Sequence, residues 1–458
     1  METCAICHMS ESIVQTDVAL KGELLGRSNV NSNYWDYKSS CGRTASNDYY
    51  QYPAMMVPAM LSDLMSIVVE TCPNVTSVYD PFIGSGTVQT EAMTLGLDCF
   101  GVDVNPLAIL LSRCKAGPFL PDQLESKAED LLSVIEDDTS SRREAKFVGL
   151  TKWFQPKVII ELSKIRRAIR TERDLWARRF FWVVLAETVR RTSNSRTSTF
   201  KLHIRTASDI AVRRLSSVEV FESVLDRNIQ LCRTQTEKLR EGGLLSRGRY
   251  IGQVHAKLGS VLDLSSPGTF DFLVTSPPYG DNVSTVPYGQ SSYLPLQWID
   301  LSDIDRQASN KFLRSTHEID GRSLGGRTRD ALDVLDGLRD ASPHLASLLD
   351  CLKHKPIDRT IRVAAFCRDL HKSIGSIISS LRKDAYMIWV VGNRRVGGEE
   401  VNLAHILSDY LRAAGAREVT TLGREILSKR MAVKNSVSCT MKKESILVFR
   451  NARQGAQR

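Results

Sequence analysis

A hydroxyl, two stiff carbonyls and an aromatic ring follow one another at residues 275–279, which read TSPPY. The apolar run before them, residues 270–274, predicts a buried strand, and the two prolines fix their φ angles and end it. Ligands of an open α/β sheet bind at the carboxyl ends of its strands. We therefore expect the Ser-Pro-Pro-Tyr part to face a ligand pocket, although a proline-rich turn after a core strand gives the same pattern.

A second candidate site is the octet DPFIGSGT at residues 80–87, between a predicted strand at 75–79 and a predicted helix at 89–95. Glycines at such a turn let the backbone approach a ligand, and the helix N-terminus offers it unpaired N–H groups. One helix later, residues 99–103 predict another strand that ends in a carboxylate, which suits ribose hydroxyls. A Gly-x-Gly pair alone is a weak signal, but the octet followed by this carboxylate is more specific.

Together these stretches resemble the S-adenosylmethionine-dependent DNA amino-methyltransferases, which methylate exocyclic amines of cytosine or adenine. The octet is similar to their cofactor loop, residues 101–108 (GVDVNPLA) to their second cofactor strand, and TSPPY to their catalytic loop. Residues 52–58 (YPAMMVP) are similar to the segment that closes over the methionine end of the cofactor. The resemblance covers approximately residues 30–120 and 250–450.

The resemblance implies S-adenosylmethionine as cofactor and double-stranded DNA as partner, and it leaves open a cognate restriction endonuclease encoded separately. Its cofactor-binding residues fall on Tyr52, Pro53, Asp80, Pro81, Phe82, Gly84, Ser85, Gly86, Thr87, Asp103, Asn105 and Ser260. Its catalytic residues fall on Ser276, Pro277, Pro278 and Tyr279. Asp80 is placed to meet the ammonium group of the cofactor. Ser260 departs from the family, which usually has Asp there beside the adenine ring.

The catalytic loop suits methylation of an amine that is a poor nucleophile. An exocyclic amine shares its lone pair with the ring, and two acceptors can hold its hydrogens so that the lone pair points at the methyl group. The Ser276 hydroxyl and the Pro277 carbonyl both accept hydrogen bonds. Transfer from a sulfonium is an in-line displacement that depends on alignment. Tyr279 offers a stacking face to a base that has left the duplex.

Serine at the first catalytic position resembles the cytosine-N4 branch, because adenine enzymes more often carry Asp or Asn there. We therefore expect a site-specific cytosine-N4 DNA methyltransferase, the modification component of a restriction-modification or defence system. Three alternatives stay open, namely an adenine-N6 DNA methyltransferase, an RNA guanine methyltransferase and a non-catalytic DNA-binding protein. The last is disfavoured because Asp80, the loop glycines and Ser276 are all present.

Alternating strand and helix patterns predict the element order that positions these loops. We expect an α/β, Rossmann-like seven-stranded methyltransferase sheet, mostly parallel with a terminal antiparallel hairpin, plus a helical insert. The further strands are expected at residues 250–258, 385–391, 417–427 and 444–450. The expected parts are 1–120 with the cofactor loop, 121–250 as a basic, DNA-contacting helical insert, and 251–458 with the catalytic loop. Residues 1–50 and the excursion 300–356 are expected to be irregular.

Positive charge is concentrated in the centre of the chain. The 458 residues carry a net charge of +9. Residues 141–250 hold 25 Lys and Arg against 11 Asp and Glu, a net +14, so the remainder carries −5. Such a segment is typical of a face that meets phosphates, and a solvated helical surface is the alternative. The expected DNA-binding residues are Arg190, Arg191, Asn194, Arg196 and Lys201, with Lys429 and Arg430 between the last strands.

Composition narrows the class of protein. A hydrophobic content of 42% and a charged content of 25% are ordinary for a globular chain. No apolar run reaches the roughly 20 residues that span a bilayer, and the N-terminus lacks a secretory signal, so we expect a cytoplasmic protein. Residues 4–8 (CAICH) spell a haem-attachment pattern, but that chemistry needs export. We therefore expect no metal site.

Overall fold

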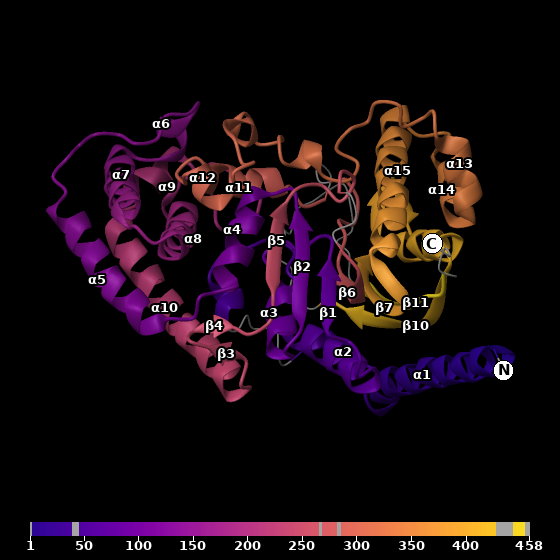
Figure 1. Cartoon of the computed structure of the whole chain (residues 1–458). Coiled ribbons are helices and arrows are strands. Elements are labelled where there is room, and N and C mark those ends of the chain that lie inside the picture. Colours follow the sequence, from indigo (N-terminus) through magenta and orange to yellow (C-terminus); the bar gives the residue numbers. More distant parts are fainter. Residues whose placement is uncertain (1, 39–44, 265–267, 282–284, 427–442, 454–458) are drawn as a thin grey trace.

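A computed structural model describes residues 2–38, 45–264, 268–281, 285–426 and 443–453. The main strands are β1 (Ser77–Asp80), β2 (Asp98–Asp103), β5 (Val254–Leu258), β6 (Phe270–Thr275), β7 (Leu381–Gly392), β10 (Ala416–Glu425) and β11 (Lys443–Asn451). They form one sheet in the order β10-β11-β7-β6-β1-β2-β5 (Figure 1). The five strands from β5 to β7 run parallel, and β11 runs antiparallel to both β7 and β10. The predicted fold class is confirmed.

Helices cover both faces of this sheet. Those of the sheet region are α1 (Glu2–Val30), α2 (Pro58–Thr71), α3 (Thr87–Thr94), α4 (Pro106–Lys115), α13 (Leu335–Ala341), α14 (Pro343–Leu352), α15 (Ile357–Ser379) and α16 (Leu403–Ala413). Side chains of β7 alternate between the faces, as the period of a strand requires. Ile388 and Val390 pack with α1, α2 and α3, whereas Met387 and Trp389 pack with α14, α15 and α16.

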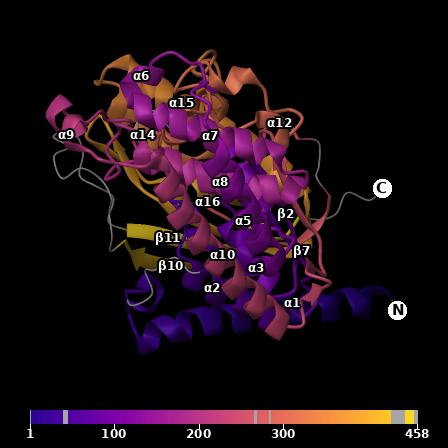
Figure 2. The same cartoon turned by 90° about the vertical axis from the view of Figure 1, so that its left-hand side faces the viewer.

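A helical lobe lies beyond the β5 edge of the sheet (Figures 1 and 2). It contains α5 (Pro121–Asp137), α6 (Leu150–Trp153), α7 (Pro156–Thr171), α8 (Leu175–Thr192), α9 (Ala207–Val212) and α10 (Ser217–Glu241). Residues 180–185 of α8 are buried, as their apolar run predicts. The lobe shares one hydrophobic core with α4, α11 (Tyr288–Leu296) and α12 (Leu301–Ile304). Its helices therefore pack directly against elements on both sides of the insert in the sequence.

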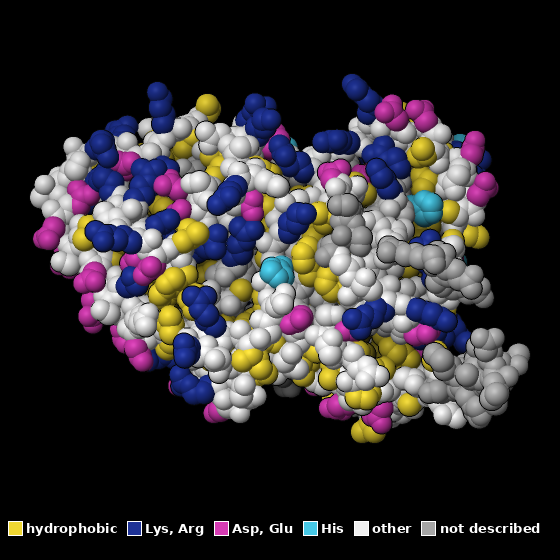
Figure 3. All heavy atoms as spheres, in the orientation of Figure 1, with side chains coloured by type: hydrophobic (Ala, Val, Ile, Leu, Met, Phe, Trp, Pro, Cys, Tyr) yellow, Lys and Arg dark blue, Asp and Glu magenta, His cyan; other side chains and the backbone are white. Residues whose placement is uncertain are grey.

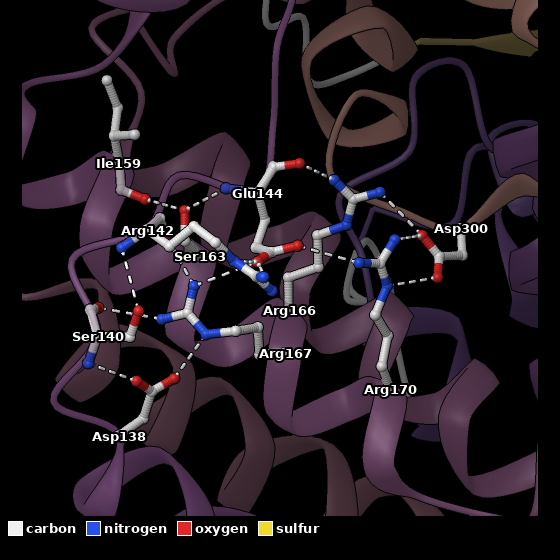
Figure 4. Close-up of polar contacts among 10 residues, drawn as sticks. All are labelled: Asp138, Ser140, Arg142, Glu144, Ile159, Ser163, Arg166, Arg167, Arg170 and Asp300. Atoms are coloured by element: carbon white, nitrogen blue, oxygen red, sulfur yellow. Dashed lines mark hydrogen bonds and ion pairs between the residues drawn. The ribbon is translucent and has the colours of Figure 1, made fainter.

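An ionic network attaches α7 to the chain before and after it (Figure 4). Arg166 and Arg170 each bind Asp300, at 2.8 and 2.7 Å. Arg170 also pairs with Glu144 at 3.0 Å, and Arg167 pairs with Asp138 at 2.7 Å. Burial opposes the ionisation of Asp300, but hydrogen bonds from Arg170 and Arg166 outweigh it and lower its pKa. Much of the positive charge of the lobe is therefore committed to internal ion pairs.

The expectation that residues 1–50 are irregular is wrong, because α1 occupies Glu2–Val30. Figures 1 and 2 show this helix along the lower edge of the molecule. Its Leu20 and Leu24 are fully buried against the sheet, and its Asp17 binds Arg450 of β11 at 2.9 Å. The apolar side chains of α1 follow no clear helical stripe, so the sequence pattern alone does not reveal the helix.

Two other expectations need partial correction. The segment 300–356 contains α12, α13 and α14 together with the short 3₁₀ helices η3 (Asn310–Leu313) and η4 (Asp320–Arg322). The strand expected at 250–258 is shorter in the structure, where β5 begins at Val254, and Tyr250 belongs instead to a small hairpin of β3 (Leu245–Ser246) and β4 (Arg249–Tyr250). A second small hairpin joins β8 (Arg394–Val396) to β9 (Glu399–Val401), and η1 (Tyr34–Asp36) and η2 (Ala45–Asp48) precede α2. Among the described helices, none is long and apolar enough to cross a bilayer.

Candidate active site

Loops at the carboxyl edge of the sheet enclose a cavity of about 850 Å³, including its open mouth. The predicted cofactor residues that line it are Tyr52, Pro53, Pro81, Phe82, Gly84, Ser85, Thr87, Asp103, Asn105 and Ser260. From the predicted catalytic loop, Ser276 and Pro278 line the same cavity. Asp80, Gly86, Pro277 and Tyr279 are not part of its wall. The fold thus brings two loops, nearly 200 residues apart in the chain, to one cavity.

The glycine-rich turn after β1 has backbone angles that side chains rarely adopt. Gly84 and Gly86 have φ angles of +50° and +81°, and α3 begins at the next residue, Thr87. A Cβ atom on Gly86 would lie 2.9 Å from the hydroxyl oxygen of Ser112. The hydroxyl of Ser85 is buried without a hydrogen-bond partner among the described residues, and Ser85 lines the cavity. Since buried polar groups are normally satisfied, this hydroxyl fits contact with a polar ligand.

Asp103 ends β2 at the wall of the cavity. Its carboxylate accepts the backbone N–H of Gly84 at 2.9 Å and that of Asn105 at 2.8 Å. Burial raises the pKa of Asp103 to about 6, although these hydrogen bonds act in the opposite direction. A carboxylate has about four acceptor positions, so the group keeps capacity for a further hydrogen bond. The group therefore fits the hydroxyls of a ribose.

Asn105 holds two parts of the cavity wall together. Its side-chain oxygen accepts the N–H of Leu107 and so caps α4. Its amide donates to the hydroxyl of Tyr52 at 3.0 Å and to that of Ser292 at 2.8 Å. The ring of Tyr52 packs over Gly84, since a Cβ there would lie 3.6 Å from it. Asn105 thereby fixes the segment that covers the glycine-rich turn.

Asp80 joins the two loops. Its side chain is only 1% exposed and accepts the Thr275 hydroxyl at 2.7 Å and the Phe82 N–H at 3.0 Å. Burial raises the pKa of Asp80 to about 7, against the effect of these hydrogen bonds. The contact with the cofactor ammonium remains a prediction. What the geometry adds is a bond between the end of β1 and the end of β6.

Hydrogen bonds connect the predicted catalytic loop to β11. The Ser276 hydroxyl donates to the Tyr279 hydroxyl at 3.1 Å, and Tyr279 donates to the Glu444 carboxylate at 2.9 Å. Burial, followed by the charge of Glu444, raises the pKa of Tyr279. Glu444 in turn pairs with Arg424 of β10 at 3.2 Å. Pro277 is buried, and the ring of Tyr279 packs partly against the core between the sheet and α15.

Several residues of this site are absent from the sequence-based expectations. Glu444 and Arg424 lie more than 140 residues after the catalytic loop. Ala54, Met55, Met56, Ile83 and Val104 also line the cavity and lie within the predicted motif segments, and Gly259 lies beside Ser260. The wall residues outside those segments are Val88, Val261, Tyr288, Ile319, Arg322, Ser323 and Leu324. Four of these come from the excursion 300–356. No local pattern marks them, because each is defined by what it touches after folding.

Most of the predicted DNA-binding residues of the insert make intramolecular contacts. Arg190 and Arg191 both bind the buried carboxylate of Glu187, at 2.7 and 2.8 Å. Asn194 is buried, and its amide donates to the carbonyl of Lys152 at 3.0 Å. The first two cations keep partial exposure, at 21% and 35% of the side chain. Their contact with DNA remains a prediction.

The other predicted DNA contacts differ in their surroundings. Arg196 is exposed, and Lys201 is half-buried, in a small loop closed by the bridge between Ser195 and Ile204. Lys429 and Arg430 lie outside the described residues.

A second groove adjoins this cavity and shares Val104, Gly259, Ser260, Arg322 and Ser323 with it. Its cationic lining residues are Lys311, Arg322, Arg327, Arg368 and Lys372, against the carboxylates Asp263 and Asp369. Three of these cations, Lys311, Arg327 and Lys372, are exposed and form no ion pair within the described part of the chain. Figure 3 shows Lys and Arg side chains along the upper part of this face, between the positions of α12 and α15 in Figure 1. The groove therefore presents net positive charge beside the cavity.

Comparison with known proteins gives one strong relationship. No protein-family model matches the chain. It is 31% identical over 462 residues to the Type II methyltransferase M.MvaI of Kocuria varians. The alignment covers 96% of this chain and 99% of that protein. A solved structure of the rRNA methyltransferase aviRa from Streptomyces viridochromogenes aligns with 91% of this chain and 96% of its own, at 11% identity. The TM-score of this alignment is 0.33.

Proposed function

Because the chain belongs to the type II methyltransferases, we propose that it transfers a methyl group from S-adenosylmethionine to the exocyclic N4 amine of cytosine in duplex DNA. The observation that carries this proposal is the single cavity lined by the glycine-rich turn and by Ser276. Its physiological role would be the modification component of a restriction-modification system, with a cognate endonuclease encoded separately. The chemistry needs a donor and an amine held within one enclosed space.

The residues present fit the cofactor. S-adenosylmethionine supplies a methyl group on a positively charged sulfur. Asp103 would accept hydrogen bonds from the ribose hydroxyls, and the unpartnered hydroxyl of Ser85 would bond to a polar group of the same ligand. A side chain at Gly84 would narrow the space between the turn and the ring of Tyr52, because its Cβ would lie 3.6 Å from that ring. Ser260 lines the cavity at the position proposed for the adenine ring, with a hydroxyl that already accepts the Leu262 N–H.

The amine is proposed to bind at Ser276. The Ser276 hydroxyl and the Pro277 carbonyl would accept its two hydrogens and turn its lone pair toward the methyl group. The stacking of Tyr279 on the flipped base remains a prediction, because Tyr279 is not part of the cavity wall and its ring packs partly against the core. The serine itself supports cytosine over adenine, and adenine N6 is the alternative outcome of the test below.

We propose that the DNA backbone crosses the basic groove beside the cavity. Counter-ions are released when Lys and Arg side chains meet phosphates, and each contact adds about 0.9 to the slope of log affinity against log salt. Neutralising Lys311, Arg327 and Lys372 together should therefore flatten this slope by about 3. The insert 121–250 was expected to supply these contacts, and Arg196 is its exposed candidate.

A matched control distinguishes the effect of the groove cations on the salt slope from the effect of the protein's net charge. Lys21, Lys383 and Arg417 are exposed and lie on α1 or at the amino ends of β7 and β10, far from the carboxyl edge. Their neutralisation removes the same charge and should leave the slope unchanged. Equal slopes for the two triple variants would reject the groove, and a drop on Arg196→Gln alone would move the contact to the insert.

Single-molecule sequencing of DNA from cells that express the protein tests the main proposal. We expect N4-methylcytosine within one recognition sequence, and none with Ser276→Ala. N6-methyladenine in place of N4-methylcytosine would favour the alternative base, and unmodified DNA with methylated RNA would overturn the DNA assignment. In tritiated methyl transfer to duplex DNA, Ser276→Ala should lower the rate by about 100-fold, while gel-shift affinity is retained.

A further inference from the structure

A continuous chain of polar contacts runs from the cavity wall into the protein. It begins at Ser276, passes through the hydroxyl of Tyr279 at 3.1 Å, and reaches Glu444 at 2.9 Å. The second carboxylate oxygen of Glu444 lies 3.2 Å from Arg424. Arg424 is 7% exposed, and the Glu444 side chain is 14% exposed. All four groups are thus shielded from bulk water, apart from the face of Ser276 that lines the cavity.

The chemistry of its inner end fixes the direction of every hydrogen in this chain. A carboxylate paired with Arg is ionised and can only accept hydrogen bonds. Tyr279 must therefore donate its single O–H to Glu444, so that the Tyr279 oxygen accepts the hydrogen bond from Ser276. Ser276 then donates its single O–H to Tyr279. What Ser276 presents to the cavity is an oxygen with lone pairs and no hydrogen.

We propose that Glu444 is a positioning residue that fixes the Ser276 hydroxyl as an acceptor, so that the site selects a base carrying an amine over one carrying a carbonyl. The inference rests on the proposed function, since it concerns how that site recognises its target. An exocyclic amine offers hydrogens to such an oxygen, whereas the O4 carbonyl of uracil offers only lone pairs and meets another acceptor. Glu444 acts through Tyr279 and Ser276 and does not itself reach the cavity wall.

Glu444→Gln should reverse the chain of hydrogen bonds. Arg424 has only donors, so the amide oxygen of the new side chain must face it. The amide NH₂ then faces Tyr279 and donates to its oxygen. Tyr279 in turn donates to Ser276, whose own hydrogen now points into the cavity. A change of one atom, with nearly the same volume, converts the acceptor at Ser276 into a donor.

The first measurement is methyl transfer to a duplex that contains the sequence methylated by the wild type. Glu444→Gln should lower kcat by about 100-fold, as loss of one aligned hydrogen bond in a transition state does, with cofactor affinity unchanged. Glu425→Gln is the matched control, because Glu425 is an exposed acid at the same end of the terminal hairpin. It should methylate at the wild-type rate. A wild-type rate for Glu444→Gln would overturn the proposal.

The second measurement distinguishes positioning from a merely structural role. Gel-shift affinities are compared for duplexes with cytosine or uracil at the target, and the cytosine-to-uracil ratio of each variant is divided by that of the wild type. The weaker pairing of uracil cancels in this comparison. Glu444→Gln should shift the ratio toward uracil by about tenfold. This is the effect expected when one hydrogen bond is replaced by repulsion between two acceptors. An unchanged ratio would overturn the proposal.

Combining Glu444→Gln with Tyr279→Phe separates positioning of Ser276 from a structural role of Glu444. Without the Tyr279 hydroxyl, Glu444 has no connection to Ser276. Glu444→Gln should therefore cause no further loss of kcat in the Tyr279→Phe background. Equal losses in both backgrounds would assign Glu444 a structural role with Arg424 and overturn the proposal. If the wild type methylates adenine, the N4 assignment fails but the acceptor inference stands, because adenine also carries an amine.

Discussion

The bond between Thr275 and Asp80 offers a quantitative test of how the two loops are joined. Thr275 is fully buried at the end of β6, and its hydroxyl donates to Asp80 at 2.7 Å. Thr275→Val removes this donor with little change of shape and leaves Asp80 with the Phe82 N–H. A hydrogen bond to an ionised group contributes about 1.5–3 kcal/mol. That loss should raise the pKa of Asp80 further, because the hydrogen bond from Thr275 favours the ionised carboxylate.

The pH dependence follows from the sign of the existing shift. Asp80 has a pKa of about 7 in the folded protein, above its ordinary value of about 4, so its ionisation costs stability increasingly between those pH values. At pH 5.5 the folded state holds Asp80 protonated in both proteins, and the variant loses only about 1 kcal/mol of ordinary hydrogen bonding. At pH 9 the wild type is ionised, and the variant should lose about 1–2 kcal/mol more.

Urea unfolding at pH 5.5 and pH 9 measures the loss of unfolding free energy at each pH. Thr275→Ser is the control, because it keeps the hydroxyl and loses one methyl group, at a cost of about 1 kcal/mol that is the same at both pH values. Methyl transfer at pH 9 should fall with Thr275→Val and persist with Thr275→Ser. An equal loss of stability for Thr275→Val at the two pH values would refute the assigned bond and its role in joining the loops.

Three further outcomes are expected at the cofactor cavity. Cofactor affinity should rise with pH up to and slightly above pH 6 and then level off. The reason is that the ionised form of Asp103, whose pKa is about 6, accepts the ribose hydroxyls. Calorimetric titration of Asp103→Asn should show a cofactor affinity without this pH dependence. Gly86→Ala should destabilise the protein by about 1–3 kcal/mol, from the positive φ angle and the contact with Ser112, and chemical denaturation should show partial relief in a double variant with Ser112→Gly. Gly84→Asp should abolish calorimetric cofactor binding, since it adds a side chain and a charge where backbone must approach the ligand, and an unchanged affinity would remove the cofactor assignment.

The sequence by itself determined the class of fold and the two loops of the site. Strands such as β6 and β7 are continuous apolar runs, because both faces of a parallel sheet are buried, and that pattern is visible without any partner. Gly84, Gly86 and the two prolines signal their turns through backbone constraints that are local to each residue. Loops after parallel strands must meet at one edge, so the shared cavity followed from the strand pattern as well.

What only the tertiary structure decided is how side chains distant in the chain meet. The pairing of Arg190 and Arg191 with Glu187, and the exposure of Lys311 and Lys372, depend on helix packing that charge counts do not contain. Glu444 gains its place behind Ser276 only because β11 inserts between β7 and β10 in the sheet. Hydrogen bonds and ion pairs act over a few ångströms in space, whereas sequence patterns report only neighbours along the chain.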